Sequence, residues 1–201
     1  DVVVDFNADA ASNGRIAELF RNARIPAVAM EGAMPSAPFV GANNWRAGSL
    51  AGEHAARLIA EKLGGWDQVD RVILVEMESA GELVLLRTEA FAAALEAAFG
   101  EEAEAKVLRV LGGNQYADAR RAVEKVLPDL NAGGRYVVTA VNAEALQGAV
   151  DALAGAGLWR ADAVVCLSHG DGEVIREQLA RGIADAAVIY HAERYGAAAV
   201  P

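Results

Sequence analysis

The sequence is poor in cysteine and in aromatic residues. A single cysteine among 201 residues allows no disulfide within the chain, so cysteine usage indicates no compartment. That residue, Cys166, lies in the apolar run 163–167, which predicts a small buried side chain. No apolar run reaches the roughly 18 residues that a membrane-spanning helix needs, and no signal-peptide pattern is present.

Positive charge is also scarce. The chain has 18 Lys and Arg against 28 Asp and Glu, a net charge of −10. Nucleic acid and anionic membranes would be repelled by this balance, so neither is expected as a direct partner. A DNA-binding segment encoded outside this stretch is left open.

Motifs that would indicate catalysis or a metal site are missing. The sequence has no phosphate-binding G-x-x-x-x-G-K-[ST], no G-x-G-x-x-G, no G-x-S-x-G, no H-E-x-x-H and no paired C-x-x-C. Its histidines, at 54, 169 and 191, are far apart. We therefore expect no metal, no cofactor and no enzymatic activity. The pair Ser168–His169 is the one candidate that an enzymatic reading offers.

What the chain does have is a regular alternation of strand-like and helical segments. Strands are predicted near 2–6, 26–30, 38–42, 71–76, 106–110, 136–141, 163–168 and 186–190, and helices near 11–23, 46–63, 80–99, 116–127, 143–156, 172–181 and from 193 onward. This pattern predicts an α/β fold with doubly wound parallel sheets. The run 72–75 is apolar throughout, as in strands buried on both faces.

Two of the predicted helices carry further signals. Ser79 and Glu82 have the spacing of a capping box before the helix 80–99. In the helix 46–63, apolar residues at helical spacing predict a buried stripe of Ala47, Leu50, Ala51, Ala55, Leu58 and Ile59. Gly64 and Gly65 are expected to end that helix.

Nearly every predicted strand ends in an amide or another polar residue. The set comprises Asn7, Glu31, Asn43, Asn44, Glu76, Asn142, Ser168, His169 and Tyr190. In open α/β sheets, ligands bind outside the carboxyl ends of the strands. A polar ligand cleft is therefore predicted there, for a small hydroxylated molecule.

Several motifs, read in order, resemble the type I periplasmic sugar-binding fold, which solute-binding proteins of transporters share with the effector domains of LacI-type repressors. Residues 25–31 resemble the family's I-P-V-V-x-x-D, and residues 39–44 with the Ala-Gly pairs at 47–48 and 51–52 resemble its V-x-x-D-N followed by A-G and A-G. Residues 87–91 resemble R-x-x-G-F, and residues 142–149 resemble N-D-x-x-A-L-G-A.

The resemblance implies two lobes with a ligand between them. Residues 1–43 would form part of the first lobe, to which 191–201 return, and residues 44–190 would form a complete second lobe. The sequence starts in a strand and stops in a helix, so we expect a piece of a longer polypeptide.

The resemblance also implies the ligand-binding residues. Glu31 stands where the family usually has a sugar-binding aspartate, and Gly32 where many members have arginine. The other matched positions are Asn44, Arg87, Asn142, Asp171 and Tyr190. The aspartate after Asn142 is replaced by alanine.

Each assignment has a structural alternative. Asn142 and Asp171 precede helices and would serve equally as N-caps. Arg87 would suit a solvated helix surface, and Asn43 with Asn44 a turn. Trp45, Tyr116 and Tyr190 are candidates for stacking on a sugar or, alternatively, for core or surface positions.

The function implied is non-enzymatic binding of a small polar solute, a sugar above all, as the substrate-binding component of an ABC transporter. Its partner would then be a membrane permease and its place the periplasm or, lipid-anchored, the cell exterior. The alternative is the effector-binding domain of a LacI-type transcriptional regulator in the cytoplasm, which would reach DNA only through a segment absent from this chain. Homodimer formation stays open in both cases.

Overall fold

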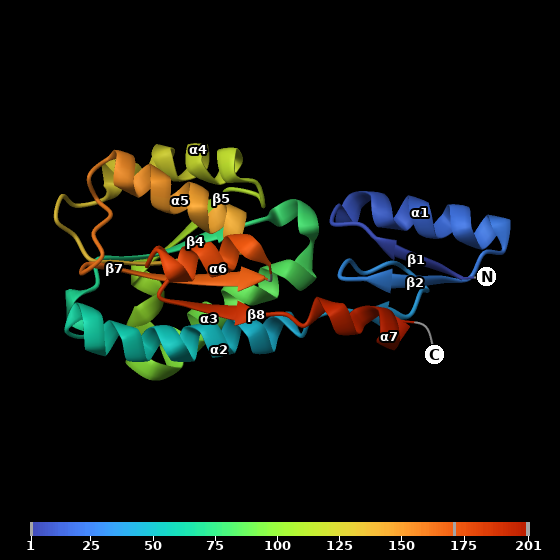
Figure 1. Cartoon of the computed structure of the whole chain (residues 1–201), viewed down its shortest axis with the longest axis horizontal. Helices are drawn as coiled ribbons and strands as arrows, with labels where there is room; N and C mark the ends of the chain where they lie inside the picture. Colours follow the sequence, from blue (N-terminus) through green and yellow to red (C-terminus); the bar gives the residue numbers. More distant parts are fainter. Residues whose placement is uncertain (1, 171, 200–201) are drawn as a thin grey trace.

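The structure is a computed structural model that describes residues 2–170 and 172–199. Its strands form two parallel sheets, which build two parts side by side along the long axis of the molecule (Figure 1). We call the part on the five-stranded sheet the large part and the part on the three-stranded sheet the small part. The predicted α/β fold with parallel sheets is confirmed.

The sheet of the large part has the order β5-β4-β6-β7-β8, with every neighbouring pair parallel. Its strands are β4 (Arg71–Glu76), β5 (Val107–Leu111), β6 (Tyr136–Ala140), β7 (Val164–Gly170) and β8 (Ala186–Ile189). The β4 strand lies between β5 and β6, with Val72 opposite Val107 on one side and Val137 on the other.

Helices cover both faces of this sheet. On one face lie α2 (Asn44–Leu58) and α3 (Glu82–Phe99), and on the other lie α4 (Tyr116–Val126) and α5 (Ala143–Gly155), with α6 (Glu173–Ala180) beside α5. Shorter helical turns occupy Ile59–Leu63, Trp66–Gln68, Glu78–Ala80, Glu101–Lys106, Leu127–Asp129 and Ala192–Arg194. None of the helices in the described ranges is long and apolar enough to cross a membrane.

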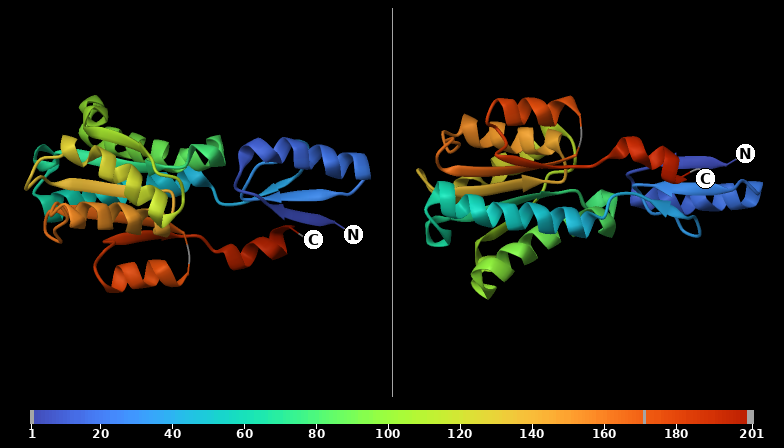
Figure 2. Two further views of the ribbon diagram at one scale, coloured as in Figure 1. Left: turned by 90° about the horizontal axis from the view of Figure 1, so that it is seen from above. Right: turned by 60° about the horizontal axis from the view of Figure 1, so that its bottom comes forward.

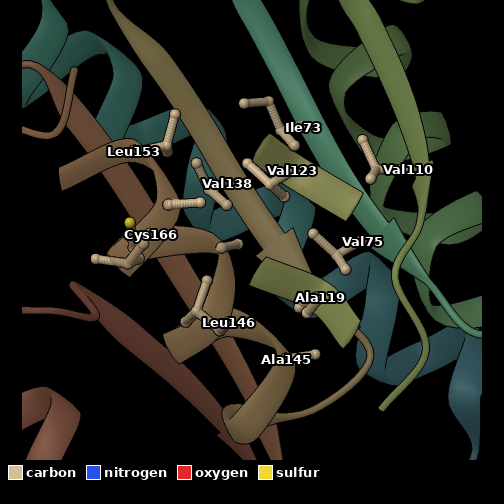
Figure 3. Packing of buried hydrophobic residues seen from close by; sticks show 14 of the residues in the cluster. Ile73, Val75, Val110, Ala119, Val123, Val138, Ala145, Leu146, Leu153 and Cys166 are labelled. Atoms are coloured by element: carbon tan, nitrogen blue, oxygen red, sulfur yellow. The ribbon is translucent and has the colours of Figure 1, made fainter. Parts of the chain in front are cut away.

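The apolar run of β4 is explained by this double cover. Successive side chains of a strand point to opposite faces. Val72 and Leu74 pack in the cluster with α2 and α3. Ile73 and Val75 pack in the other cluster, with α4 and α5 (Figure 3). Both faces exclude water, as the unbroken apolar pattern predicted.

The small part contains β1 (Val3–Phe6), β2 (Ala27–Met30) and β3 (Phe39–Val40) in that order, again parallel. The helix α1 (Ala10–Ala23) packs against this sheet, and α7 (Tyr195–Ala199) returns to β2 and β3 from the far end of the chain. The buried cluster here is formed by Ala17, Ala29 and Met34.

The two parts are joined by two stretches of chain. One leads from β3 to α2, and the other leads from β8 to α7 (Figure 2). The proposed lobe boundaries, with residues 1–43 and 191–201 in one lobe and 44–190 in the other, stay a prediction.

Some local predictions were wrong. Ser79 and Glu82 form no capping box, because Ser79 lies in a separate helical turn and Gly81 occupies the N-cap position of α3. The stripe predicted for the helix 46–63 is buried at Ala47, Ala51, Ala55 and Ile59, but Leu50 is 41% exposed, since the buried face of α2 also includes Gly48 and Gly52, which approach α3. Gly64 does end the following turn, with a φ of 81°, as predicted.

Candidate functional site

A cavity of about 260 Å³ lies between the two parts. We call it the cleft. Residues from both parts and from the returning segment line it: Phe6, Ala8, Glu31, Gly32, Met77, Ala80, Val84, Arg87, Asn114, Val141, Asn142, Gly170, Tyr190, Ala192 and Tyr195. Many of them directly follow or end a strand, because parallel strands bring their carboxyl ends to one edge.

Arg87 holds the centre of this cleft. It extends from α3 and is only 9% exposed, so it is not a solvated helix residue. Its Nε donates to Oδ1 of Asn44 at 2.6 Å, and its Nη1 donates to the carbonyl oxygen of Val141 at 2.8 Å. Its Nη2 lies 3.6 Å from Oε2 of Glu31 in the small part. The guanidinium therefore links the large part, the small part and the segment that joins them.

Asn44 contacts Arg87 from outside the cleft. It begins α2, is buried, and does not line the cleft. Its neighbour Asn43 is the N-cap of that helix and accepts from the backbone N–H of Arg46 at 2.9 Å, so the predicted turn is a helix start. The contact with the Arg87 Nε fixes the plane of the guanidinium.

Glu31 follows β2 and adopts a left-handed backbone with a φ of 60°. A non-glycine residue in this region costs of order 1–3 kcal/mol, and such strain gathers at ligand-binding positions. Its Oε1 accepts from the backbone N–H of Ala42 at 2.8 Å. At Gly32, the next residue, a Cβ atom would lie 2.1 Å from the carbonyl oxygen of Asn7, so no larger side chain fits there.

Asn142 caps a helix and also lies in the wall of the cleft. As N-cap of α5, its Oδ1 accepts from the backbone N–H of Ala145 at 2.9 Å. Its Nδ2 donates to the carbonyl oxygen of Asn114 at 2.9 Å, and the side chain also lines the cleft. A capping asparagine therefore faces the cavity.

Tyr190 closes the cleft at the end of β8. The Cζ atom of Arg87 lies 4.8 Å from the centre of its ring, a cation–π geometry. Burial raises the pKa of Tyr190 to about 12, although Arg87 opposes the shift. Its hydroxyl lies 3.2 Å from Nδ1 of His169, and burial together with Arg87 lowers the pKa of His169 to about 3. Both side chains are therefore neutral at physiological pH.

Ser168 and His169 do not form a nucleophile and base. They are neighbours in β7 and point to opposite faces of the sheet. The Ser168 Oγ donates to Oε1 of Gln178 at 3.1 Å, whereas His169 faces Tyr190. His191 is exposed and pairs with Glu193, and neither His169 nor His191 lines the cleft.

The structure thus brings Glu31, Arg87, Asn142 and Tyr190 to one cavity, with Asn44 behind it. Asp171 lies outside the described residues. Of the other candidate aromatic residues, Trp45 is exposed, and Tyr116 donates to Oδ2 of Asp151 at 2.8 Å; both lie away from the cleft.

Sequence reasoning missed Asn114 and Tyr195. Asn114 follows β5 after two glycines, so the rule of polar residues at strand ends could have found it. Tyr195 begins α7 and carried no such signal. Burial, followed by the hydrogen bond with Glu31 and its charge, raises the pKa of Tyr195, so this phenol is neutral as well. Within the part of the chain that the structure describes, no cluster of His, Cys, Asp or Glu could hold a metal ion.

Comparisons with known proteins agree with this architecture. The sequence profile of the family described as periplasmic binding protein domain matches residues 1–201. No curated protein matches the chain.

Solved structures share the fold at low sequence identity. An ABC transporter solute-binding protein from Bacillus halodurans C-125 with bound myo-inositol has 22% identity and a TM-score of 0.77, over 99% of this chain and 66% of that one. A periplasmic solute-binding protein from Actinobacillus succinogenes 130z with bound D-allose has 16% identity and a TM-score of 0.77, over 100% and 68%.

A regulator has the same fold. The LacI family transcriptional regulator from Enterococcus faecium with bound ribose has 19% identity and a TM-score of 0.62, over 84% of this chain and 58% of that one. The chain spans about two thirds of the length of the two transport proteins, and less of the regulator.

Proposed function

The chain belongs to the periplasmic binding protein domain family, and on that premise we propose that it binds a small polar solute, a sugar or a sugar-like polyol, in the cleft. Binding, and not catalysis, is the proposed activity. The candidate ligand-binding residues are Glu31, Arg87, Asn142 and Tyr190, with Asn44 orienting Arg87.

The buried Arg87 carries this proposal. Its guanidinium is held in place by Asn44, Val141 and Glu31, and Arg87 also lines the cavity. A rigid, planar donor of this kind suits oxygen acceptors arranged at fixed spacing, as on a sugar ring. Because Arg87 is largely buried, a hydrogen bond from it to a solute hydroxyl would be strengthened.

Apolar surface in the cleft suits the flat faces of a sugar ring. Phe6 and Tyr195 come from the small-part side, and Met77 and Val84 line the opposite wall. Aromatic side chains offer apolar area next to a polar tip, so they can cover C–H groups while amides and the guanidinium bind hydroxyls.

For the wider role, we propose the substrate-binding component of an ABC transporter, working with a membrane permease outside the cytoplasm. The alternative is the effector-binding domain of a LacI-type regulator. The LacI family transcriptional regulator from Enterococcus faecium supports this alternative, since it has the same fold and a bound ribose.

Asn142 offers a test with a matched control. The N-caps Asn142 and Asn43 each accept one backbone N–H at 2.9 Å, but Asn142 alone of the two lines the cleft. Each change to alanine should cost about 1 kcal/mol of folding stability. We expect Asn142→Ala in addition to weaken solute binding, whereas Asn43→Ala should leave binding unchanged.

The solute would first be identified by mass spectrometry of material that co-purifies and by thermal shifts with myo-inositol, D-allose, D-ribose and related sugars. Titration calorimetry then gives affinities and thermal melts give stabilities for both variants. A folded wild-type chain that binds none of the sugars and polyols would contradict the proposed function.

A further inference from the structure

The charges that line the cleft cancel. Among the lining residues that the structure describes, Arg87 is the sole basic side chain and Glu31 the sole acidic one. Their side chains are only 10% and 19% exposed, and Nη2 of Arg87 lies 3.6 Å from Oε2 of Glu31. A charge so far removed from water needs a partner of opposite sign. Each of these two groups supplies that partner for the other.

The Glu31 carboxylate accepts hydrogen bonds from other residues of the protein. Its Oε1 accepts from the backbone N–H of Ala42 at 2.8 Å, and Tyr195 hydrogen-bonds with it from α7. The left-handed backbone at Glu31 fixes the direction of the side chain as well. These contacts hold the carboxylate from its own side of the cleft, where it lies beside Arg87.

The remaining titratable groups add no charge at neutral pH. Burial keeps the phenols of Tyr190 and Tyr195 protonated, and His169 behind Tyr190 stays neutral. The described wall of the cleft consequently carries one positive and one negative charge in contact, and no net charge.

We propose that Glu31 sets the charge selectivity of the cleft: by neutralising Arg87 it admits uncharged polyols and keeps out sugar acids. This inference rests on the proposed function. A carboxylate on the solute would approach an arginine that is already paired, and Glu31 would repel it. Like charges in contact at a binding site disfavour binding, so a sugar acid should bind more weakly than its neutral partner. Neutral hydroxyls meet no such penalty.

The test compares matched neutral and anionic sugars on four chains. The pairs are D-galactose with D-galacturonate and D-glucose with D-glucuronate, measured by calorimetry at neutral pH. The chains are the wild type, Glu31→Gln, Glu31→Asp and the control Glu177→Gln. Glu177 pairs with Arg181 at 3.0 Å on the exposed surface of α6, so its change removes the same charge away from the cleft.

We expect the acid-to-neutral affinity ratio to rise at least about tenfold in Glu31→Gln, since the freed guanidinium can then pair with the solute. In Glu31→Asp and Glu177→Gln the ratio should stay within about twofold of the wild type, because neither changes the charge beside Arg87. An unchanged ratio in a folded Glu31→Gln chain would overturn the proposal.

Two further outcomes separate this inference from the proposed function. If the wild type binds no neutral solute but Glu31→Gln gains binding of the sugar acids, the proposed function fails and the role of Glu31 stands. If wild type and Glu31→Gln both fail to bind any of the probes, both fail. Should Glu31→Gln not fold, the wild type and Glu31→Asp decide: a sugar acid bound as tightly as its neutral partner overturns the proposal.

Discussion

The large and small parts follow the same βα alternation, yet they bury their sheets very differently. In the large part, residues 72–75 of β4 are fully buried and helices cover both faces of the sheet. In the small part, the buried cluster comprises Ala17, Ala29 and Met34, while Val4 and Phe6 on β1 and Val2 just before it are exposed. The cleft is therefore built between a well-packed wall and a loosely packed one. Regions with few buried apolar contacts open first, so the small part is expected to be the more easily unfolded wall.

The largest expected effect follows from this difference in packing. Leu146→Ala removes a fully buried side chain from the cluster under α4 and α5, and such changes cost about 2–5 kcal/mol. Met34→Ala in the small part should cost less than half as much and leave the large part protected. Chemical denaturation with hydrogen exchange measures both. If both variants lost the same free energy of unfolding, with protection reduced over the whole chain, the two parts would not differ in stability.

The free energy of unfolding should depend on pH through His169, which lies in the large part. The pKa of His169 is about 3 when folded, against an ordinary value of 6.5, because it is buried and faces Arg87. As pH falls from about 6.5 toward about 3, His169 binds a proton in the unfolded chain but stays neutral in the folded chain. Stability is thus complete above about 6.5 and falls by up to about 1.4 kcal/mol per pH unit below it.

His169→Gln should flatten that loss, and His191→Gln, which changes an exposed histidine, should not. Urea denaturation at several pH values is the measurement. A slope that is equally steep in His169→Gln would assign the acid sensitivity to other groups.

Close helix packing gives the next effect. A Cβ atom on Gly48 in α2 would lie 2.1 Å from the carbonyl oxygen of Arg87, whereas one on Gly14 in α1 meets nothing within 4 Å. Gly48→Ala should therefore push α2 from α3 and cost about 1–3 kcal/mol, as overpacking does. Gly14→Ala should instead stabilise by about 0.5–1 kcal/mol, because alanine favours a helix. Thermal melts decide; a neutral Gly48→Ala would mean that the helix interface adapts.

The smallest expected effect concerns the edge of the small sheet. Within the described residues β1 pairs with β2 alone, so its other edge can recruit another strand, and the exposed side chains of Val4 on β1 and of Val2 just before it add apolar surface there. We expect weak self-association that Val4→Lys reduces, measured by light scattering over a concentration series. Leu111→Lys, on the β5 edge of the large sheet, is the control. If that variant alone reduces association, the contact lies on the other sheet.

The sequence predicted most elements because their patterns are local. The unbroken apolar run of β4 required two covered faces, and Gly64 marked the end of a helical segment. The start of α3 was mispredicted, since the spacing of Ser79 and Glu82 carries no information on which residue takes the cap geometry.

At the site, polar residues after strands pointed to Glu31, Asn142 and Tyr190, which the structure gathers in one cavity. The pairing of Arg87 with Glu31 could not be predicted, because it joins two parts of the chain through a contact that depends on how they dock. Their roles in binding stay predictions.

The most direct test of the central claim is the affinity of the identified solute for an Arg87→Gln chain. The account predicts that binding weakens roughly 100-fold, since removing a buried charged hydrogen-bonding partner costs 2 kcal/mol or more. Arg181→Gln, on the exposed end of α6, should bind as the wild type does. Calorimetry on chains with unaltered hydrogen-exchange protection in the large part gives the answer. An Arg87→Gln chain that is folded and binds with wild-type affinity would contradict the cleft as the binding site.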